Sequence, residues 1–357
     1  MIYYRPIAQQ GHRPPGALSL AGGWCWFTQA ERLERGRAPV LVAISEMPDD
    51  WLTALTAVRV PLVDRLSPAP SPAGRGGGGQ AVGLTMDRPR LMGILNVTPD
   101  SFSDGGRYLQ ADAALIQAQA MRGAGADILD IGGESTRPGA DLVATAEETR
   151  RTAPVIDALH RDLPDLPISI DTRKALVASA ALAAGASMVN DVSALSFDPG
   201  LAAVVAGAGV PVFLMHAQGA PDTMQQDPRY GDVLLDVFDA LAARVAAAEA
   251  AGIARGRIVV DPGIGFGKTV AHNLALIRGL SLFHGLGCPV LLGASRKRFI
   301  GTIAGVDDPA ARMPGSVAVA LAAVAQGVQI LRVHDVAATR QALDLWQAIA
   351  EPEGLKR

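Results

Sequence analysis

Short apolar runs alternate with longer, alanine-rich stretches over most of the chain. The apolar runs have the length and composition of buried parallel strands: Leu91–Val97, Ile128–Ile131, Ile168–Ile170, Met188–Asp191, Val212–Met215, Ile258–Val260, Val290–Leu292 and Ile330–Val333. The stretches between them have helical character, among them Ala111–Arg122, Glu147–His160, Val233–Ala251 and Gly315–Gln326. Alternating strands and helices predict right-handed crossovers and a parallel sheet.

Eight such units in succession favour a closed barrel over an open sheet. A (β/α)8 barrel typically takes about 250 residues, which is close to the length of the region from residue 90 to residue 357. We therefore predict an α/β protein whose residues 90–357 form a (β/α)8 TIM barrel. An open, doubly wound sheet is the alternative.

The first 66 residues follow a different pattern and hold three of the four tryptophans. We expect strands at Pro39–Ile44 and Val58–Val63, and between them a short helix capped by Asp49. Trp51, Leu52, Leu55 and Val58 would share one face of this helix. Residues 1–66 are thus predicted to be a small α+β appendage of unknown role. Residues 67–80, which include SPAPSPAGRGGGG, have the composition of a flexible linker.

Composition narrows the class of protein. Hydrophobic residues make up 49% of the chain, enough for a large core, and the net charge of −3 gives no reason to expect nucleic acid or an anionic membrane as partner. Cys25 and Cys288 fit neither a zinc site nor a disulfide framework, which favours a reduced, cytoplasmic location. We expect no signal peptide, because the N-terminal stretch MIYYRPIAQQGHRPP has no apolar core of the required length. We expect no membrane span either, because the most apolar stretch, Val317–Leu331, is short and contains two glutamines.

Polar or ionisable residues stand at the carboxyl end of every predicted strand, where the loops of such a barrel build the active site. They include Asn96, Asp130, Asp171, Asn190, Asp191, His216, Asp261, Lys297, Arg332 and His334. A single Asp or Asn after a strand is more often a helix cap or a turn residue than a ligand. Eight polar strand ends in one barrel mouth are hard to explain as eight caps, so we expect a site there.

The charges of these residues indicate what the site binds. Arg137, Lys297, Arg332 and His334 are cationic or can become so, which points to a phosphorylated or otherwise anionic substrate. The alternative for each one alone is a surface ion pair.

Asp171, Asn190 and Asp261 follow apolar strands and should lie deep in the mouth. A buried carboxylate needs donors, and a flat heterocycle with an amino group beside a ring N–H offers two. Asn190 can both donate and accept. For Asp171 a cap on the helix starting near Lys174 remains the alternative.

Two further features concern a metal ion and a ligand wall. Asn96 offers an oxygen ligand for Mg²⁺ beside a bound phosphate, with a turn-stabilising role as the alternative. The sequence shows no His/Cys cluster of the kind that zinc enzymes use. The stretch from Asp261 to Lys268 is glycine-rich but fails the Walker A spacing. We interpret its glycines as room for a flat ligand, with Phe266 as a wall.

The motifs at the strand ends resemble those of the dihydropteroate synthase family. They are, in order, NVTPDSFSDGG, DIGGESTRPGA, ISIDT, NDVSAL, LMH, DPGIGFGK, GASRKRFIG and RVHD, and they span about residues 90 to 350. The resemblance implies a (β/α)8 barrel, a homodimer, and a transferase of folate biosynthesis. Such an enzyme condenses 6-hydroxymethyl-7,8-dihydropterin diphosphate with 4-aminobenzoate to 7,8-dihydropteroate and pyrophosphate.

The resemblance also implies roles for individual residues. Asp171, Asn190, Asp261 and Lys297 match the pterin-binding positions. Asn96, Arg332 and His334 match the diphosphate end, with Asn96 also the Mg²⁺ ligand. Phe266 and residues of two loops match the aminobenzoate site: Phe102 and Asp104 in the first loop, and Thr136, Arg137 and Pro138 in the second. Catalysis would rest on Asp171, Lys297, Arg332 and His334.

Two positions depart from the family pattern. Arg298 stands where a serine is often found, so the role of that serine is not transferred, and Ile264 stands where an aromatic residue is frequent. A pterin-binding paralogue without turnover is therefore kept as an alternative. A pterin-dependent methyltransferase, which shares the barrel, is another; it would usually pair with a corrinoid partner or domain, and the sequence shows no such domain.

Overall fold

Eight parallel strands form a nearly closed barrel in the computed structural model, which describes residues 1–57, 84–97, 107–135, 142–219 and 224–350. The hydrogen-bonded order is β11-β10-β9-β8-β7-β6-β13-β12, so the strands follow one another around the barrel and the last lies beside the first. A parallel bridge between Val260 and Val290 joins the two ends of the sheet. The predicted barrel is confirmed, and the open sheet is not formed.

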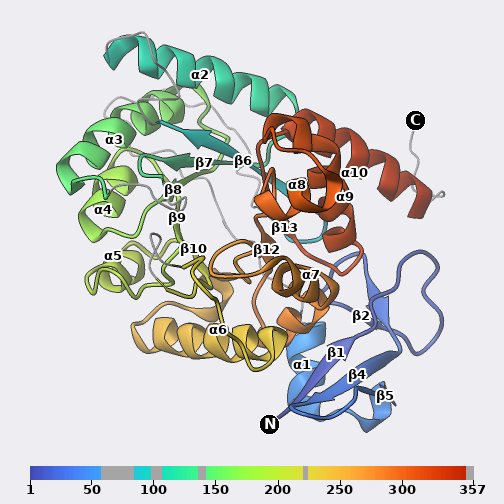
Figure 1. Ribbon diagram of the computed structural model, residues 1–357. Helices are drawn as coiled ribbons and strands as arrows, with labels where there is room; N and C mark the ends of the chain where they lie inside the picture. Colours follow the sequence, from blue (N-terminus) through green and yellow to red (C-terminus); the bar gives the residue numbers. More distant parts are fainter. Residues whose placement is uncertain (58–83, 98–106, 136–141, 220–223, 351–357) are drawn as a thin grey trace, which may run out of the picture.

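The barrel strands alternate with helices that surround the sheet (Figure 1). The strands are β6 (Arg90–Asn96), β7 (Ile128–Gly132), β8 (Ile168–Asp171), β9 (Met188–Asp191), β10 (Val212–Met215), β11 (Ile258–Asp261), β12 (Leu291–Leu292) and β13 (Ile330–Val333). The helices are α2 (Arg107–Gly123), α3 (Thr145–Asp162), α4 (Ala175–Ala183), α5 (Leu201–Ala208), α6 (Val233–Ala250), α7 (Val270–Arg278), α8 (Arg298–Ala304), α9 (Met313–Val324) and α10 (Val336–Ala350). Each predicted strand and helix lies within a few residues of an observed one.

The N-terminal residues form two small antiparallel sheets and one helix. Their elements are β1 (Ile2–Pro6), β2 (Leu18–Ser19), β3 (Trp26–Phe27), β4 (Gln29–Glu34), β5 (Val40–Ala43) and α1 (Asp49–Thr56). The predicted strand at Pro39–Ile44 corresponds to β5. The prediction that Asp49 caps the helix is wrong: Pro48 is the N-cap, and Asp49 is the first helical residue. The strand predicted at Val58–Val63 and the linker, residues 67–80, lie outside the described residues.

Aromatic packing and polar contacts hold this N-terminal part against the barrel. The ring of Trp51 in α1 stacks on Phe238 in α6, with ring centroids 5.6 Å apart. The Tyr3 hydroxyl donates to the carboxylate of Asp239, also in α6, at 2.8 Å. Trp24 donates from Nε1 to the carbonyl of Val324 at the end of α9. The N-terminal part therefore lies against the barrel helices, with α1 beside the end of α6 (Figure 1).

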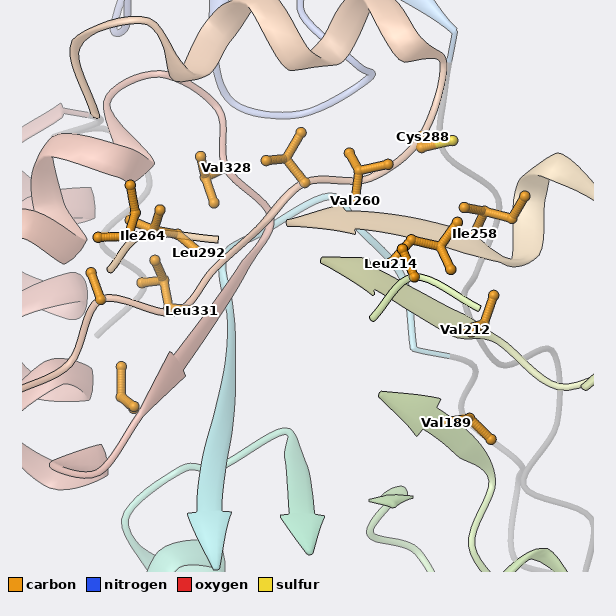
Figure 2. Packing of buried hydrophobic residues seen from close by; sticks show 14 of the residues in the cluster. Val189, Val212, Leu214, Ile258, Val260, Ile264, Cys288, Leu292, Val328 and Leu331 are labelled. Atoms are coloured by element: carbon orange, nitrogen blue, oxygen red, sulfur yellow. The ribbon is translucent and has the colours of Figure 1, made fainter. Parts of the chain in front are cut away.

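Side-chain alternation along each barrel strand separates two hydrophobic regions. Val212 and Leu214 of β10 belong to the large cluster between the sheet and the helices, part of which Figure 2 shows. Phe213, between them, belongs to a second cluster. This second cluster takes one residue from each of seven barrel strands: Met92, Ile128, Met188, Phe213, Val259, Leu291 and Ile330. Only the barrel interior is shared by so many strands, so these residues fill the inside of the barrel, with Leu84 and Met86.

None of the described helices combines the length and the apolar character that a membrane span requires.

Candidate active site

The functional side chains lie two residues beyond the apolar interior layer. Met188 belongs to this layer, and Asn190 follows it on the same face of β9. Val259 and Asp261 are related in the same way on β11, as are Ile330 and Arg332 on β13. The two-residue repeat of the strand therefore places these polar groups inside the barrel, at the carboxyl end of the sheet.

Arg332 lies between two acidic side chains contributed by different strands. Its Nε donates to Oδ2 of Asp130 on β7 at 2.6 Å, and one terminal nitrogen donates to Oδ2 of Asp171 on β8, also at 2.6 Å. Nδ2 of Asn190 donates to the same Oδ2 of Asp130 at 3.0 Å. Four strands thus meet in one hydrogen-bonded network, which includes three residues that the sequence placed in the site.

Asp171 belongs to this network and does not cap a helix. The first turn of α4 is instead capped from elsewhere, because Ala175 donates its backbone N–H to the Asp198 carboxylate. Burial raises the pKa of Asp171 to about 7, and the nearby charge of Asp130 acts in the same direction, while Arg332 opposes the shift. The alternative interpretation of Asp171 as a cap is therefore wrong.

Asp261 and Lys297 lie near each other in the mouth, where each influences the ionisation of the other. Burial raises the pKa of Asp261, and the positive charge of Lys297 opposes that shift. The pKa of Lys297 is lowered to about 8, chiefly by burial and against the pull of Asp261. The Lys297 ammonium donates to the carbonyl of Ile264 and lies 4.4 Å from the centroid of the Phe266 ring. The sequence-predicted residues Asp261, Phe266 and Lys297 are thus brought together.

Side chains from several elements hold the glycine-rich loop that follows β11. Asp261 accepts from the backbone N–H of Gly263 at 2.7 Å. Lys268 donates from Nζ to the Phe266 carbonyl at 2.9 Å. Further hydrogen bonds run from Gly265 N–H to Asn273, from Gln225 to the Gly265 carbonyl and from the Tyr230 hydroxyl to the Gly267 carbonyl. The position of Phe266 is therefore fixed by its own backbone as well as by Lys297.

The glycines of this loop make room for the chain itself. A Cβ at Gly263 would lie 1.9 Å from the carbonyl oxygen of His216, and one at Gly267 would lie 2.4 Å from that of Gln218. Both glycines have positive φ, +67° and +63°. The expectation that the glycines leave space for a flat ligand is wrong at these two positions, since neighbouring backbone occupies the space.

Asn96 and His334 lie at two further strand ends. A Cβ at Gly132 would lie 3.4 Å from Oδ1 of Asn96 and 3.8 Å from Oδ2 of Asp171, so the missing side chain leaves open the space between these oxygens. His334 donates its backbone N–H to Oγ of Ser295, and its Nδ1 lies 3.0 Å from the same atom. The ring of His334 is thereby oriented by the strand end of β12.

The remaining predicted residues do not all fall within the described chain. Phe102, Asp104, Thr136, Arg137 and Pro138 lie outside it. Arg298 is the exposed first residue of α8. Ile264 is fully buried in the large hydrophobic cluster, so this position belongs to the core (Figure 2).

Two residues take part in the site although the sequence assigned neither of them a ligand. Asp130 is completely buried and contacts both Arg332 and Asn190. Lys268 is 3% exposed and lies with Nζ 3.0 Å from Nδ1 of His216. The signal for Asp130 is its distance of two residues from Ile128 on the same strand, which places it on the inner face. No comparable spacing identifies Lys268, because it lies at the end of a loop and not on a strand.

Across the described parts of the chain, no three His, Cys, Asp or Glu side chains are grouped closely enough to hold a metal ion by themselves.

Comparisons with known proteins agree with this geometry. The family described as "Pterin binding enzyme" matches residues 92–334. A dihydropteroate synthase from Neisseria meningitidis serogroup C is 50% identical over 269 residues, which cover 74% of this chain and 94% of the relative.

Two solved structures from Xanthomonas albilineans are also similar. Its dihydropteroate synthase with 4-aminobenzoic acid is 52% identical, with a TM-score of 0.70, over 74% of this chain and 94% of the other. The same enzyme in complex with 7,8-dihydropteroate is 49% identical, with a TM-score of 0.68, over 74% and 95%. By fold, by site geometry and by these similarities, the chain belongs to the dihydropteroate synthase family of pterin-binding enzymes.

Proposed function

We propose that this chain condenses 6-hydroxymethyl-7,8-dihydropterin diphosphate with 4-aminobenzoate to give 7,8-dihydropteroate and pyrophosphate, as a transferase of folate biosynthesis. The observation that carries the proposal is the joint position of Arg332, Asp171, Asn190, Asp261 and Lys297 inside one barrel mouth. Similar enzymes have been solved with 4-aminobenzoic acid and with 7,8-dihydropteroate.

The pterin ring fits the deep, acidic part of the mouth. Asp261 is 6% exposed, and one of its oxygens, Oδ1, already accepts from Gly263, which leaves Oδ2 to accept from an N–H of the ring. Asn190 presents its oxygen away from Asp130, because a carboxylate can only accept. Asp171 and Lys297 complete the set of pterin-binding residues that we propose.

The diphosphate fits the cationic side of the mouth, at Arg332 and His334. Asn96 would hold Mg²⁺ through its side-chain oxygen, with diphosphate oxygens and water as the other ligands, a donor set that Mg²⁺ prefers. The open space beside Gly132, next to Asn96, suits a shared ion of this kind. Mg²⁺ would neutralise negative charge on the leaving diphosphate.

The aminobenzoate ring fits against Phe266, whose ring and backbone are both fixed. Thr136 and Arg137, with Phe102 and Asp104, are the other residues that we propose for this subsite, on the family pattern alone.

The reaction breaks the bond between the pterin methylene carbon and the diphosphate oxygen. It forms a bond from that carbon to the amine nitrogen of 4-aminobenzoate, and the amine releases one proton. Arg332 and His334 would stabilise the negative charge of the departing pyrophosphate. Asp171 would favour positive charge on the pterin as the bond breaks, and Lys297 would hold Phe266 and the ring in place. The pattern suits a path in which pyrophosphate leaves before the amine attacks.

The wider setting is part of the same proposal. We place the enzyme in the cytoplasm and expect it to act as a homodimer, with residues 1–66 as an appendage packed on the barrel and residues 67–80 as the linker between them. Light scattering from purified protein, with and without the first 80 residues, tests the dimer and the independence of the barrel.

Release of pyrophosphate by the purified protein tests the activity. The assay contains the dihydropterin diphosphate and Mg²⁺, with and without 4-aminobenzoate. We expect release that depends on 4-aminobenzoate, with dihydropteroate formed in equal amount. Tight binding of the pterin diphosphate without any release would contradict the proposal and indicate the inactive paralogue.

A further inference from the structure

Asp130 has no assigned part in the proposed reaction, yet it lies at the centre of the hydrogen-bonded network. Its side chain is completely buried inside the barrel, on β7. Oδ2 accepts two hydrogen bonds, one from Arg332 and one from Asn190. Oδ1 is buried and has no hydrogen-bond partner among the described residues. Burial of a carboxylate costs free energy unless donors compensate for the lost water. The two donors to Oδ2 therefore indicate which groups Asp130 acts on.

The first group that Asp130 serves is Arg332. A guanidinium carries five N–H donors in a rigid plane. Asp130 takes Nε–H and Asp171 takes one terminal N–H, both at 2.6 Å, so two strands fix the plane from two sides. The other N–H groups of Arg332 then point in set directions, as the recognition of a diphosphate requires.

The second group is Asn190. An amide can rotate by half a turn and exchange its oxygen and nitrogen. The Asp130 carboxylate accepts and cannot donate, so it fixes Nδ2 of Asn190 toward β7. The Asn190 oxygen must therefore face the other way, as an acceptor for the pterin.

The third effect is on charge. Among the described residues, the charged groups that most affect the pKa of Asp171 are Arg332 on β13, Asp130 on β7, Glu148 on α3 and Asp191 on β9. Of these, Arg332 lowers the pKa of Asp171, and the three carboxylates raise it. Loss of the Asp130 charge would lower the pKa of Asp171, and it would also leave Arg332 to pair with Asp171 alone.

We propose that Asp130 is a positioning residue that orients Arg332 toward the diphosphate and Asn190 toward the pterin. The inference rests on the proposed function for its kinetic consequences. Its binding consequences do not require turnover.

The variant Asp130→Asn tests this proposal, because it keeps the size of the side chain and removes its charge and one acceptor. Binding of inorganic pyrophosphate with Mg²⁺, measured by calorimetry, should weaken tenfold or more, as expected for the loss of a charge-assisted hydrogen bond that aligns the arginine. If activity requires Asp171 to be ionised, kcat/KM rises with pH through the pKa of Asp171. Asp130→Asn lowers that pKa, so the acid side of the plot of kcat/KM against pH (the acid limb) should move to lower pH.

Ser169→Ala is the matched control. Ser169 pairs in register with Asp130 on the neighbouring strand β8, is equally buried, and has an Oγ with no partner among the described residues. A general disturbance of this layer would affect both variants. We expect Ser169→Ala to keep the wild-type pyrophosphate affinity and acid limb.

A double-mutant cycle with Arg332→Lys tests the route of the effect. If Asp130 acts through Arg332, Asp130→Asn should weaken pyrophosphate binding far less in the Arg332→Lys background than in the wild type. Equal losses in both backgrounds would overturn the proposal. Should Asp130→Asn not fold, Asp130→Glu keeps the charge but displaces the acceptor, and it should weaken pyrophosphate binding while leaving the acid limb in place.

The outcomes separate the two proposals. If the wild type binds pyrophosphate in an Asp130-dependent way but releases none from its substrates, the proposed function fails and the role of Asp130 stands. If the wild type turns over and Asp130→Asn matches it within twofold in pyrophosphate affinity, with an unmoved acid limb, the role of Asp130 is refuted.

Discussion

The Nζ atom of Lys268 lies 3.0 Å from Nδ1 of His216, and the lysine is almost completely buried at the base of the glycine-rich loop. Burial lowers the pKa of Lys268 to about 7, with the charge of Lys297 acting in the same direction. It lowers the pKa of His216 to about 3, with the charge of Lys268 also contributing. The hydrogen bond to the Phe266 carbonyl thus comes from a buried amine that is easier to deprotonate than an exposed lysine.

Replacement of this lysine should weaken binding of 4-aminobenzoate. Lys268→Met keeps the length of the side chain but removes the hydrogen bond to the Phe266 carbonyl. We expect the KM for 4-aminobenzoate to rise about tenfold, as for the loss of one buried hydrogen bond, and the KM for the pterin diphosphate to change less. Tyr230→Phe, which removes a hydrogen bond to Gly267 in the same loop, should shift the same constant by a smaller factor. A larger effect on the pterin constant would contradict this role.

The buried amine also makes stability depend on pH. The pKa of Lys268 falls from 10.5 to about 7 in the folded protein, so between these values the unfolded chain binds more protons than the folded chain. The contribution of Lys268 to the free energy of unfolding should therefore increase as the pH rises from about 7 toward 10, by at most about 1.4 kcal/mol per pH unit. Denaturant unfolding of the wild type and of Lys268→Met at several pH values measures this contribution. The difference in stability between them should grow with pH in favour of the wild type, and a constant difference would contradict the shifted pKa.

Removal of Arg332 should destabilise the barrel as well as impair catalysis. Arg332→Ala leaves the buried carboxylate of Asp130 and that of Asp171 without their cation. The expected loss is about 3–5 kcal/mol in the free energy of unfolding, measured by chemical denaturation. The control is Arg161→Ala, which removes an exposed ion pair with Asp157 and should cost less than about 1 kcal/mol. Similar losses in the two variants would show that the barrel tolerates unpaired charge at its centre.

Gly263 should not tolerate a side chain. In Gly263→Ala the new Cβ would meet the His216 carbonyl oxygen, and φ is +67°. The loop would have to move, so we expect a loss of about 3 kcal/mol or more in stability together with most of the activity. Gly209→Ala is the control, because Gly209 has φ of +64° but nothing within 4 Å of the new Cβ. It should cost only the backbone strain, about 1–2 kcal/mol, and leave kcat/KM unchanged.

Asn96 should set the requirement for Mg²⁺. In Asn96→Ala the concentration of Mg²⁺ that gives half-maximal pyrophosphate release should rise tenfold or more, in line with the loss of a metal ligand or its support. The KM for 4-aminobenzoate, measured at saturating Mg²⁺, should stay within a factor of two or so of the wild type. An unchanged Mg²⁺ dependence would remove Asn96 from the metal site.

The strand ends could be predicted because two regularities coincide there. Apolar runs such as Met188–Asp191 mark the strand, and a polar residue two positions after an inward apolar one marks the mouth. The same rule applies to Asp130, which stands two residues after Ile128 on β7. Sequence could not show that its carboxylate contacts Arg332, because 202 residues separate the two.

Other parts of the site depend on contacts that leave no local pattern. The packing of Gly263 against the His216 carbonyl is set by how two loops approach, and spacing alone suggested room for a ligand. The contact of Trp51 with Phe238 likewise joins two helices far apart in the sequence. Such contacts depend on how distant segments come together in the folded protein. A single sequence shows which residue types are present but not which of them are in contact.

The alternation along the strands has a consequence for mutational scanning. On β11, Ile258 and Val260 pack toward the helices, while Val259 and Asp261 face the interior. A library of substitutions along this strand should therefore show effects that alternate with a period of two residues. Substitutions at the outward positions would reduce the amount of folded enzyme in the cell, and those at Asp261 would leave the amount intact while abolishing growth without folate. Neighbouring positions would thus affect different measured quantities: the abundance of the protein at Val260 and the growth of the cell at Asp261.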